Sequence, residues 1–368
     1  MKLTIIDDHR ETVVDAQAGA DGAGPLLQPA AVEQALGWTL KPQGWCREDS
    51  CIPAAAAARA ERDGLLDLAA FAELLGRPYA AEIEPEGTDG VVALGVSAAE
   101  RSQSLVGRMA PDFTLAGVDG VSHSLSELRG RKVALVFWAS WCGCRYDLPE
   151  WERQHAALAE HGFSVISVAI DRRPADAAPW IAEAAATHPA LIDADGRVAD
   201  LYQVLNVPTV VWIDEEGRVA RPNDTQFATD LFQSMNGLDS GRALAALRRW
   251  VVDGESGLSE EDVERHSPQI TEAQQLARTE ATLGLWLHRA GQRVAGERHF
   301  VRAGELAPED VTIWRGSMPL LGLDPMGDDY FNKRQELVDA GIPIYRPLPD
   351  WQEPSRANGS DAAVSSAR

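Results

Sequence analysis

The sequence predicts an α/β protein in which helices flank a mixed central sheet, with a small α+β region before it and an α-helical region after it. Residues 132–138 are apolar, β-branched and aromatic, which is typical of a strand buried on both faces. Strands then alternate with helices as far as a hairpin at residues 207–220. The α-helical prediction rests on two amphipathic segments, residues 271–290 and 294–306.

Two cysteines stand one residue apart where the central strand gives way to a helix. Cys142 and Cys144 flank Gly143, and the pattern that follows is helical to about residue 160. The N–H groups and dipole of a helix N-terminus favour thiolate over thiol, and Arg145 adds positive charge nearby. We therefore expect a redox-active pair with Cys142 as nucleophile, rather than inert buried thiols or a metal site, because neither cysteine has a ligand-spaced partner.

Residues 137–149, FWASWCGCRYDLP, resemble the active-site segment of the thioredoxin superfamily, in particular that of its TlpA/ResA-like redoxins. The resemblance runs from about Ala110 to Arg221 and includes the opening APDFTL at residues 110–115. It implies a thioredoxin fold and a thiol–disulfide oxidoreductase, in which Cys142 attacks a disulfide and Cys144 resolves the mixed disulfide.

The resemblance also assigns a substrate site. It implies that Pro208 is cis and faces the dithiol, and that the backbone of Val207 and Thr209 pairs with an extended substrate. Trp141 and Gly143 complete the predicted substrate-binding residues. No cofactor is expected.

The cysteine motif is one residue shorter than the family's Cys-x-x-Cys. Positions i and i+2 of a regular helix point away from each other, so a Cys142–Cys144 bond needs Cys142 just outside the helix and Gly143 bending the backbone. Such a short ring is expected to be strained, and strained disulfides are the more oxidising ones. We therefore expect a reduction potential above the roughly −270 mV of thioredoxin.

Asp147 is the candidate for proton transfer. Thioredoxins carry a buried aspartate where this chain has Val136, whereas ResA-like proteins place a glutamate three residues after the second cysteine, at the position of Asp147. One helical turn would bring this carboxylate near Cys144, where it could shuttle a proton. The alternative, a solvated aspartate favoured by the helix dipole, stays open.

Composition excludes several classes of partner. The net charge of −22 and the pI near 4.7 argue against binding to nucleic acid or to anionic lipid. No apolar run approaches about 18 residues, and residues 1–10 are typical of a strand rather than a signal peptide. We therefore expect no membrane association and a cytoplasmic protein.

Four segments are expected along the chain. They are an N-terminal α+β domain at residues 1–105, a thioredoxin-like domain at 106–253, a helical region at 254–352 and a disordered tail at 353–368. Within the first domain the sequence predicts a loop over residues 15–29 and a capped helix over residues 63–76.

Cys46 and Cys51 are the other two cysteines of the chain. A tryptophan before Cys46 and polar residues between the two suggest a partly exposed loop, where thiols can react. Four interpretations stay open: a possible second redox pair working with Cys142, plain thiols in a small core, a structural disulfide, and half of a metal site.

The helical region resembles one tetratricopeptide unit. Leu283-Gly284, Gly291, Ala303 and Pro308 carry the resemblance, because small residues let paired helices approach. One copy cannot bury its own apolar face, so we expect it to pack on the thioredoxin-like domain or to cap a homodimer.

The predicted function is thiol–disulfide exchange on a protein or low-molecular-weight disulfide, served by a thiol reductant system. One alternative is a redox-sensing protein whose dithiol switches partner binding. A thiol peroxidase is disfavoured, because the peroxidase motif would require proline at Leu135 and threonine at Ala139.

Overall fold

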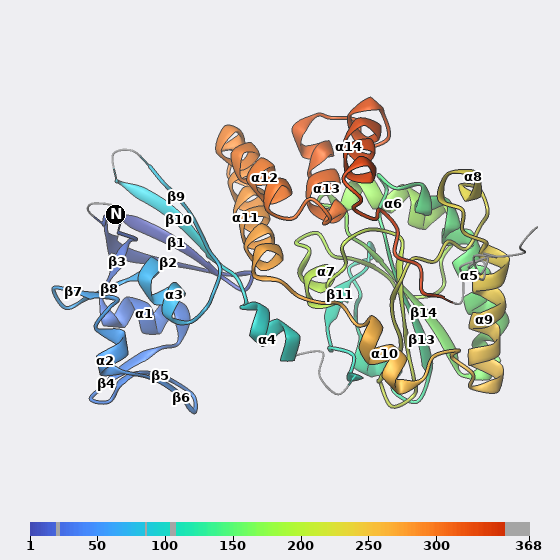
Figure 1. The fold of residues 1–368 in the computed structure, drawn as a ribbon, viewed down its shortest axis with the longest axis horizontal. Helices are drawn as coiled ribbons and strands as arrows, with labels where there is room; N and C mark the ends of the chain where they lie inside the picture. The colour runs from blue at the N-terminus through green and yellow to red at the C-terminus, as the bar shows by residue number, and fades with distance from the viewer. Residues whose placement is uncertain (20–22, 85–86, 104–107, 350–368) are drawn as a thin grey trace, which may run out of the picture. The chain divides into compact units, whose positions relative to one another are not determined.

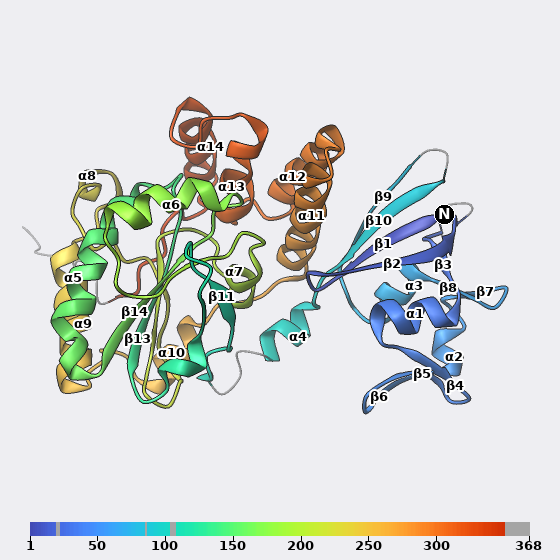
Figure 2. The ribbon, with the colours of Figure 1, turned by 180° about the vertical axis from the view of Figure 1, so that it is seen from behind.

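The structure, a computed structural model, describes residues 1–19, 23–84, 87–103 and 108–349 and consists of two compact units (Figures 1 and 2). Unit 1 comprises residues 1–111, 193–205 and 269–342, and unit 2 comprises residues 112–192, 206–268 and 343 onward. The domain boundaries expected from the sequence stay predictions. The predicted disordered tail lies outside the described residues.

Unit 2 contains the mixed sheet that the sequence predicts. β13 at its centre is parallel to β14, and β14 is parallel to β15, whereas β16 runs antiparallel to β13 and β17 antiparallel to β16. The sheet order is β15 (Ala190–Ile192), β14 (Phe163–Ala169), β13 (Lys132–Trp138), β16 (Thr209–Ile213) and β17 (Val219–Asp224). Every residue of β14 is buried, as a strand covered on both faces should be.

Two helices of unit 2 share one apolar core with this sheet. Trp151 and Leu158 of α5 (Leu148–Leu158) and Leu247 and Trp250 of α9 (Ser240–Asp253) pack with strand residues, and the Trp250 ring stacks on Trp212 at 5.0 Å. The remaining elements of unit 2 are β11 (Thr114–Ala116), β12 (Ser122–Ser124), η2 (Leu125–Leu128), η3 (Gly143–Asp147), η4 (Ala159–His161), α6 (Pro174–Glu183), α8 (Gln233–Asn236) and α10 (Glu260–His266).

Unit 1 contains a second sheet, in which β1 and β10 are parallel and the other neighbours antiparallel. Its order is β7 (Glu61–Arg62), β8 (Leu65–Asp67), β3 (Leu26–Leu27), β2 (Arg10–Gln17), β1 (Lys2–Asp7), β10 (Asp89–Leu94) and β9 (Tyr79–Ile83). The short elements beside it are α1 (Pro29–Leu36), β4 (Thr39–Lys41), β5 (Gly44–Arg47), β6 (Ser50–Pro53), α2 (Ala54–Ala57), α3 (Leu68–Leu74) and α4 (Ala98–Gln103).

Two sequence predictions in unit 1 are wrong. The segment 15–29 is not all loop, because β2 continues to Gln17 and pairs there with β3. The segment 63–76 is not one helix, because Leu65–Asp67 pairs with β3 and only then does α3 begin. Asp67 caps this shorter helix through hydrogen bonds from the N–H groups of Ala69 and Ala70.

The helical part of unit 1 consists of α11 (Glu272–Arg289), α12 (Arg293–Leu306), α13 (Val311–Leu321) and α14 (Asp328–Asp339). α11 and α12 approach closely, since a Cβ on Gly296 would lie 2.8 Å from the Gly284 carbonyl oxygen. Leu283 and Leu287 of α11 pack on residues of β1, β9 and β10. Part of the apolar face of α11 is therefore buried on the sheet of unit 1. The homodimer and the tetratricopeptide resemblance stay predictions.

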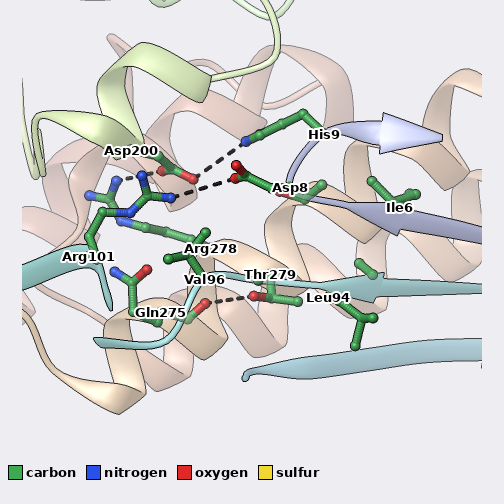
Figure 3. A pocket seen from close by; sticks show the side chains of 13 residues that line it. Ile6, Asp8, His9, Leu94, Val96, Arg101, Asp200, Gln275, Arg278 and Thr279 are labelled. Atoms are coloured by element: carbon green, nitrogen blue, oxygen red, sulfur yellow. Dashed lines mark hydrogen bonds and ion pairs between the residues drawn. The ribbon is translucent and has the colours of Figure 1, made fainter. Parts of the chain in front are cut away.

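Figure 3 shows an ion-pair network beside a cavity of about 20 Å³ in unit 1. The buried Arg278 of α11 binds Asp200 of α7 (Arg197–Leu201) at 2.5 Å and the buried Asp310 at 3.0 Å. Arg101 lies 3.7 Å from Asp8 at the same cavity. Because the cavity has room for about one water, we interpret this network as packing.

Because α11 and α12 approach so closely, we expect replacement of Gly296 by alanine to lower the free energy of unfolding. Gly→Ala within a helix normally stabilises by about 1 kcal/mol. In Gly296→Ala the new methyl would meet the backbone of α11, and we expect the free energy of unfolding to fall by about 1–3 kcal/mol. Val294→Ala, at a position 72% exposed on the same helix, should change it by less than about 0.5 kcal/mol. Equal denaturation midpoints for the two variants would contradict the close approach.

Candidate functional site

The site begins where β13 ends, and a buried carboxylate fixes the turn that follows. Asp171, just after β14, accepts hydrogen bonds from the Ser140 backbone N–H at 3.0 Å and the Ser140 hydroxyl at 2.5 Å. Burial raises the pKa of Asp171 to about 6 against the opposing hydrogen bonds from Ser140. Because β13 and β14 are adjacent, this contact fixes the backbone leading to Cys142.

Cys142 occupies the N-cap of η3 with an extended backbone, as the short motif requires. Its Sγ accepts a hydrogen bond from the Cys144 N–H at 3.3 Å and donates one to the Val207 carbonyl at 3.4 Å. Donation from a backbone N–H at a helix N-terminus is an interaction that strengthens when the sulfur is charged. The expectation that Cys142 lies just outside the helix is confirmed.

The helix after the cysteines differs from the one expected. A 3₁₀ segment, η3, spans Gly143–Asp147, and the α-helix begins only at Leu148. Pro149 lies in the first turn, where a missing N–H removes no intrahelical bond. Pro149 therefore lies at the start of the helix and does not interrupt it.

Cys144 and Asp147 are both buried at this helix start. Burial raises the pKa of the Cys144 thiol well above its ordinary value, and its hydrogen bond with Cys142 and the charges of Cys142 and Asp147 add to the effect. Burial also raises the pKa of Asp147 to about 6, although hydrogen bonds from Thr229 and Ala228 oppose the shift. Asp147 is therefore not a solvated surface aspartate.

The loop opposite the dithiol contains the cis bond that the resemblance implies, between Val207 and Pro208. The Thr209 hydroxyl donates a hydrogen bond to the Asn206 carbonyl at 2.7 Å. The Asn206 side chain accepts one from the Val207 N–H at 2.8 Å and donates one to the Ile344 carbonyl at 2.6 Å. The Val207 carbonyl is thus held beside Cys142, where the predicted substrate-binding residues belong.

The sequence also predicted roles for Arg145 and Trp141. Arg145 donates to the Ser140 carbonyl at 2.5 Å, and its guanidinium lies over the rings of Trp180 at 4.3 Å and Tyr146 at 4.9 Å. Arg145 therefore links the turn at Ser140 to the rings of Trp180 and Tyr146. Trp141 is buried, and its role in covering a substrate stays a prediction.

The sequence pattern did not indicate the segment between β17 and α9, which contacts the site directly. The Thr229 hydroxyl and the Ala228 N–H donate to the two Asp147 carboxylate oxygens at 2.5 and 3.1 Å. The ring of Phe232 lies against Gly143, so closely that a Cβ there would overlap it. Both motif cysteines are 2% exposed. The segment therefore covers the dithiol and positions its carboxylate.

Cys46 and Cys51 are joined by a disulfide in unit 1, which excludes plain thiols and a metal half-site in this structure. They are not in a loop, because Cys46 lies on β5 and pairs across the strands with both Thr39 and Cys51. Cys46 is buried and Cys51 exposed. Whether the pair is redox-active stays a prediction.

In residues 1–19, 23–84, 87–103 and 108–349, no cluster of three or more histidine, cysteine or acidic side chains could hold a metal ion. Across the same ranges, no helix has the length and apolar character needed to cross a membrane.

Comparison with known proteins identifies the family. Residues 106–221 match the model of the AhpC/TSA family. The thiol-disulfide oxidoreductase ResA of Geobacillus kaustophilus is 31% identical over 121 residues, which are 33% of this chain and 70% of that protein. The chain belongs to the TlpA/ResA-like redoxins of the thioredoxin superfamily. This redoxin therefore has a thioredoxin fold in its central domain and is a thioredoxin-like oxidoreductase.

Other relatives cover the same part of this redoxin. The ResA protein of Geobacillus thermodenitrificans is 29% identical over 123 residues, which are 33% of this chain and 71% of that protein. Among solved structures, the thioredoxin domain of a thiol-disulfide oxidoreductase of Bacteroides vulgatus is 26% identical, with a TM-score of 0.31, and the match covers 36% of this chain and 95% of that domain. Each of these two matches covers about a third of this redoxin.

The raised pKa of Asp147 predicts a pH-dependent stability. Its ordinary value is 3.8 and its folded value about 6, so folding favours the protonated form. The protonated carboxyl therefore contributes to the free energy of unfolding. This contribution is complete below the pKa of Asp147 in the unfolded chain and is lost as the pH rises through about 6. Asp147→Asn removes this ionisation. The difference in free energy of unfolding, variant minus wild type, should therefore be larger at about pH 8 than at about pH 5, by on the order of 1 kcal/mol. Urea denaturation at both pH values measures it, and a constant difference would contradict the buried, raised carboxyl.

The contact of Phe232 with Gly143 predicts that this ring limits access to the dithiol. Phe232→Ala should increase the rate of Cys142 alkylation by iodoacetamide several-fold, measured by mass spectrometry on the reduced protein. Leu231→Ala is the matched control, because Leu231 is 60% exposed on the same segment. Equal rates in both variants would show that the ring does not shield the sulfur.

Proposed function

We propose that the chain catalyses thiol–disulfide exchange through Cys142 and Cys144. The observation that carries the proposal is the position of the Cys142 sulfur. It lies between the N–H of Cys144 and the carbonyl of Val207, the residue before cis-Pro208. A nucleophilic sulfur is thereby held beside a backbone loop that can receive an extended disulfide substrate.

The exchange proceeds in two displacements. The Cys142 thiolate attacks one sulfur of the substrate disulfide, the substrate S–S bond breaks, and the other substrate sulfur leaves as a thiolate. The Cys144 thiolate then attacks the Cys142 sulfur, forming the Cys142–Cys144 disulfide and releasing the second substrate thiol. Two electrons pass from the dithiol to the substrate, and the reverse sequence oxidises a substrate dithiol.

Asp147 handles the proton of the resolving cysteine. The Cys144 pKa is raised mainly by burial, so its thiol keeps its proton until a base removes it. With a pKa of about 6, Asp147 is ionised at neutral pH and can accept that proton as Cys144 attacks. Thr229 and Ala228 hold the carboxylate in place for this role.

The substrate is a protein or low-molecular-weight disulfide, and a thiol reductant restores the dithiol. The relatives named ResA are thiol-disulfide oxidoreductases, which supports this class of reaction. The buried dithiol under Phe232 favours a substrate whose disulfide lies in an extended segment, since the cis-proline loop offers backbone rather than a deep pocket.

The test is reduction of a peptide disulfide by the full-length chain with dithiothreitol as reductant. Cys142→Ser should abolish turnover, whereas Cys144→Ser should accumulate a mixed disulfide between Cys142 and the peptide, seen as an added mass. Asp147→Asn should slow resolution more than tenfold above about pH 7 and remove the rise in rate near pH 6.

Other outcomes would select the alternatives. Steady consumption of peroxide with a thiol donor, without peptide reduction, would identify a thiol peroxidase. An oxidation-dependent change in oligomeric state without any turnover would identify a redox sensor. Unchanged turnover in Cys142→Ser would contradict the proposal outright.

A further inference from the structure

Residues 344–348, which we call the C-terminal segment, belong to unit 2, although the helices that precede them belong to unit 1. Ile344 and Leu348 are each 5% exposed, so both ends of the segment are packed. The segment lies outside residues 106–221, which match the family, and the proposed reaction assigns it no role. Its hydrogen bonds nevertheless end on two parts of the dithiol site.

The first contact is with the loop that contains cis-Pro208. The buried Asn206 side chain donates to the Ile344 carbonyl at 2.6 Å and accepts from the Val207 N–H at 2.8 Å. Because an asparagine amide carries its donor and its acceptor on different atoms, the bond to Ile344 fixes the direction of the oxygen that meets Val207. The C-terminal segment therefore orients Val207, whose carbonyl lies 3.4 Å from the Cys142 sulfur.

The orientation of Val207 decides which of its backbone groups a substrate can use. Its N–H is bonded to Asn206, so the carbonyl is the group that lies toward the dithiol. Cys142 donates to this carbonyl as a thiol, but a thiolate has no proton to donate. Ionisation of Cys142 therefore leaves the carbonyl able to accept a hydrogen bond from a backbone N–H of an extended substrate.

The second contact is with the end of β17 and the residue after it. The Leu348 N–H donates to the Asp224 carboxylate at 2.7 Å, and the Arg346 N–H donates to the Thr225 hydroxyl at 2.9 Å. Asp224 is 1% exposed and Thr225 is 6% exposed. These bonds therefore lie in a buried place, where an N–H without a partner is costly.

The chain beyond this second contact leads directly to the donors of Asp147. Ala228 and Thr229, which donate to that carboxylate, lie shortly after β17. Just before them, the buried ring of Phe227 meets the ring of Tyr345 edge-on, with the centroids 5.7 Å apart. The C-terminal segment therefore fixes the backbone that presents two hydrogen-bond donors to Asp147.

We propose that the C-terminal segment positions two groups of the site: the Val207 carbonyl that pairs with the substrate and the Asp147 carboxylate that takes up the proton of the resolving cysteine. This inference rests on the proposed function. It makes Asn206 and Thr225 positioning residues, one at each contact. The two contacts serve different steps, because the carbonyl acts in the attack on the substrate and the carboxylate in the resolution of the mixed disulfide.

The first experiment isolates the attack on the substrate. In full-length Cys144→Ser, which cannot resolve, mass spectrometry follows the formation of the mixed disulfide between Cys142 and a peptide disulfide. Adding Asn206→Ala should lower the second-order rate constant about tenfold, which corresponds to one lost hydrogen bond. Alkylation of Cys142 by iodoacetamide should keep its rate, because this reagent does not pair with the Val207 carbonyl. A peptide that reacts at the parent's rate would overturn the role of Asn206.

The second experiment isolates resolution in the chain that keeps both motif cysteines. After the reduced chain is mixed with one equivalent of peptide disulfide, Thr225→Val should slow release of the second peptide thiol several-fold, because its methyl group cannot accept the Arg346 N–H. Thr225→Ser keeps a hydroxyl at this position and should release the thiol at the wild-type rate. Equal rates in Thr225→Val and Thr225→Ser would overturn the second contact.

Comparison of the two steps separates positioning from a general loss of structure. Asn206→Ala should slow only the attack on the peptide, and Thr225→Val only the resolution. Slowing of both steps by both variants, together with faster alkylation of Cys142, would show that the segment merely holds unit 2 together and would overturn the proposal. A wild-type chain that reduces no peptide would overturn the proposed function itself, whereas normal turnover in both variants would overturn this inference alone.

Discussion

The hydrogen bonds at the Cys142 sulfur are the constraint on which the site depends. This sulfur meets the Cys144 N–H on one side and the Val207 carbonyl on the other. The first contact requires Cys142 to lie at the N-cap of η3, and the second requires the cis-proline loop to approach the same point. The sheet supplies both, since β13 leads to Cys142 and its neighbour β16 begins at Thr209.

Two buried carboxylates support that arrangement from either end of the motif. Asp171 holds Ser140 before the cysteines, and Asp147 follows them at the start of α5. Burial raises the pKa of each to about 6. Their roles differ. Asp171 accepts hydrogen bonds from Ser140 in the turn, whereas Asp147 lies near enough to Cys144 to raise the pKa of its thiol. A position near the second cysteine is what proton transfer to a resolving thiol needs.

The parts of the site that could be predicted from the sequence are those encoded locally. The buried strand, the helix start at Cys142 and the proline before Thr209 each leave a pattern within a few residues, and family resemblance supplied the cis bond. The contacts of Asp147 with Ala228 and Thr229 span 81 and 82 residues, and no local pattern marks such partners.

Tertiary pairing also explains the failures in unit 1. Leu65 and Leu66 fit a helical apolar stripe, yet their segment forms β8, because a strand partner on the sheet decides its conformation. Cys46 and Cys51 fit an exposed loop by composition, but pairing with β4 places Cys46 in a central strand. In both cases a partner distant in sequence overrides the local propensity.

Phe232 packs on the glycine between the two motif cysteines. Its segment lies beyond the region that resembles the family, yet it packs on Gly143 and contributes the donors to Asp147. A glycine between the two cysteines therefore serves the packing of that ring as well as the bend of the backbone. Access to the dithiol and the position of its carboxylate are consequently set by one segment of unit 2.

The most direct test of the account is disulfide mapping of the full-length chain after it has reduced a peptide disulfide in the absence of any other reductant. The account predicts a Cys142–Cys144 disulfide formed in proportion to the peptide reduced, found by mass spectrometry after alkylation of the remaining thiols. Peptide reduction with both Cys142 and Cys144 still alkylatable, and Cys46–Cys51 unchanged, would contradict it.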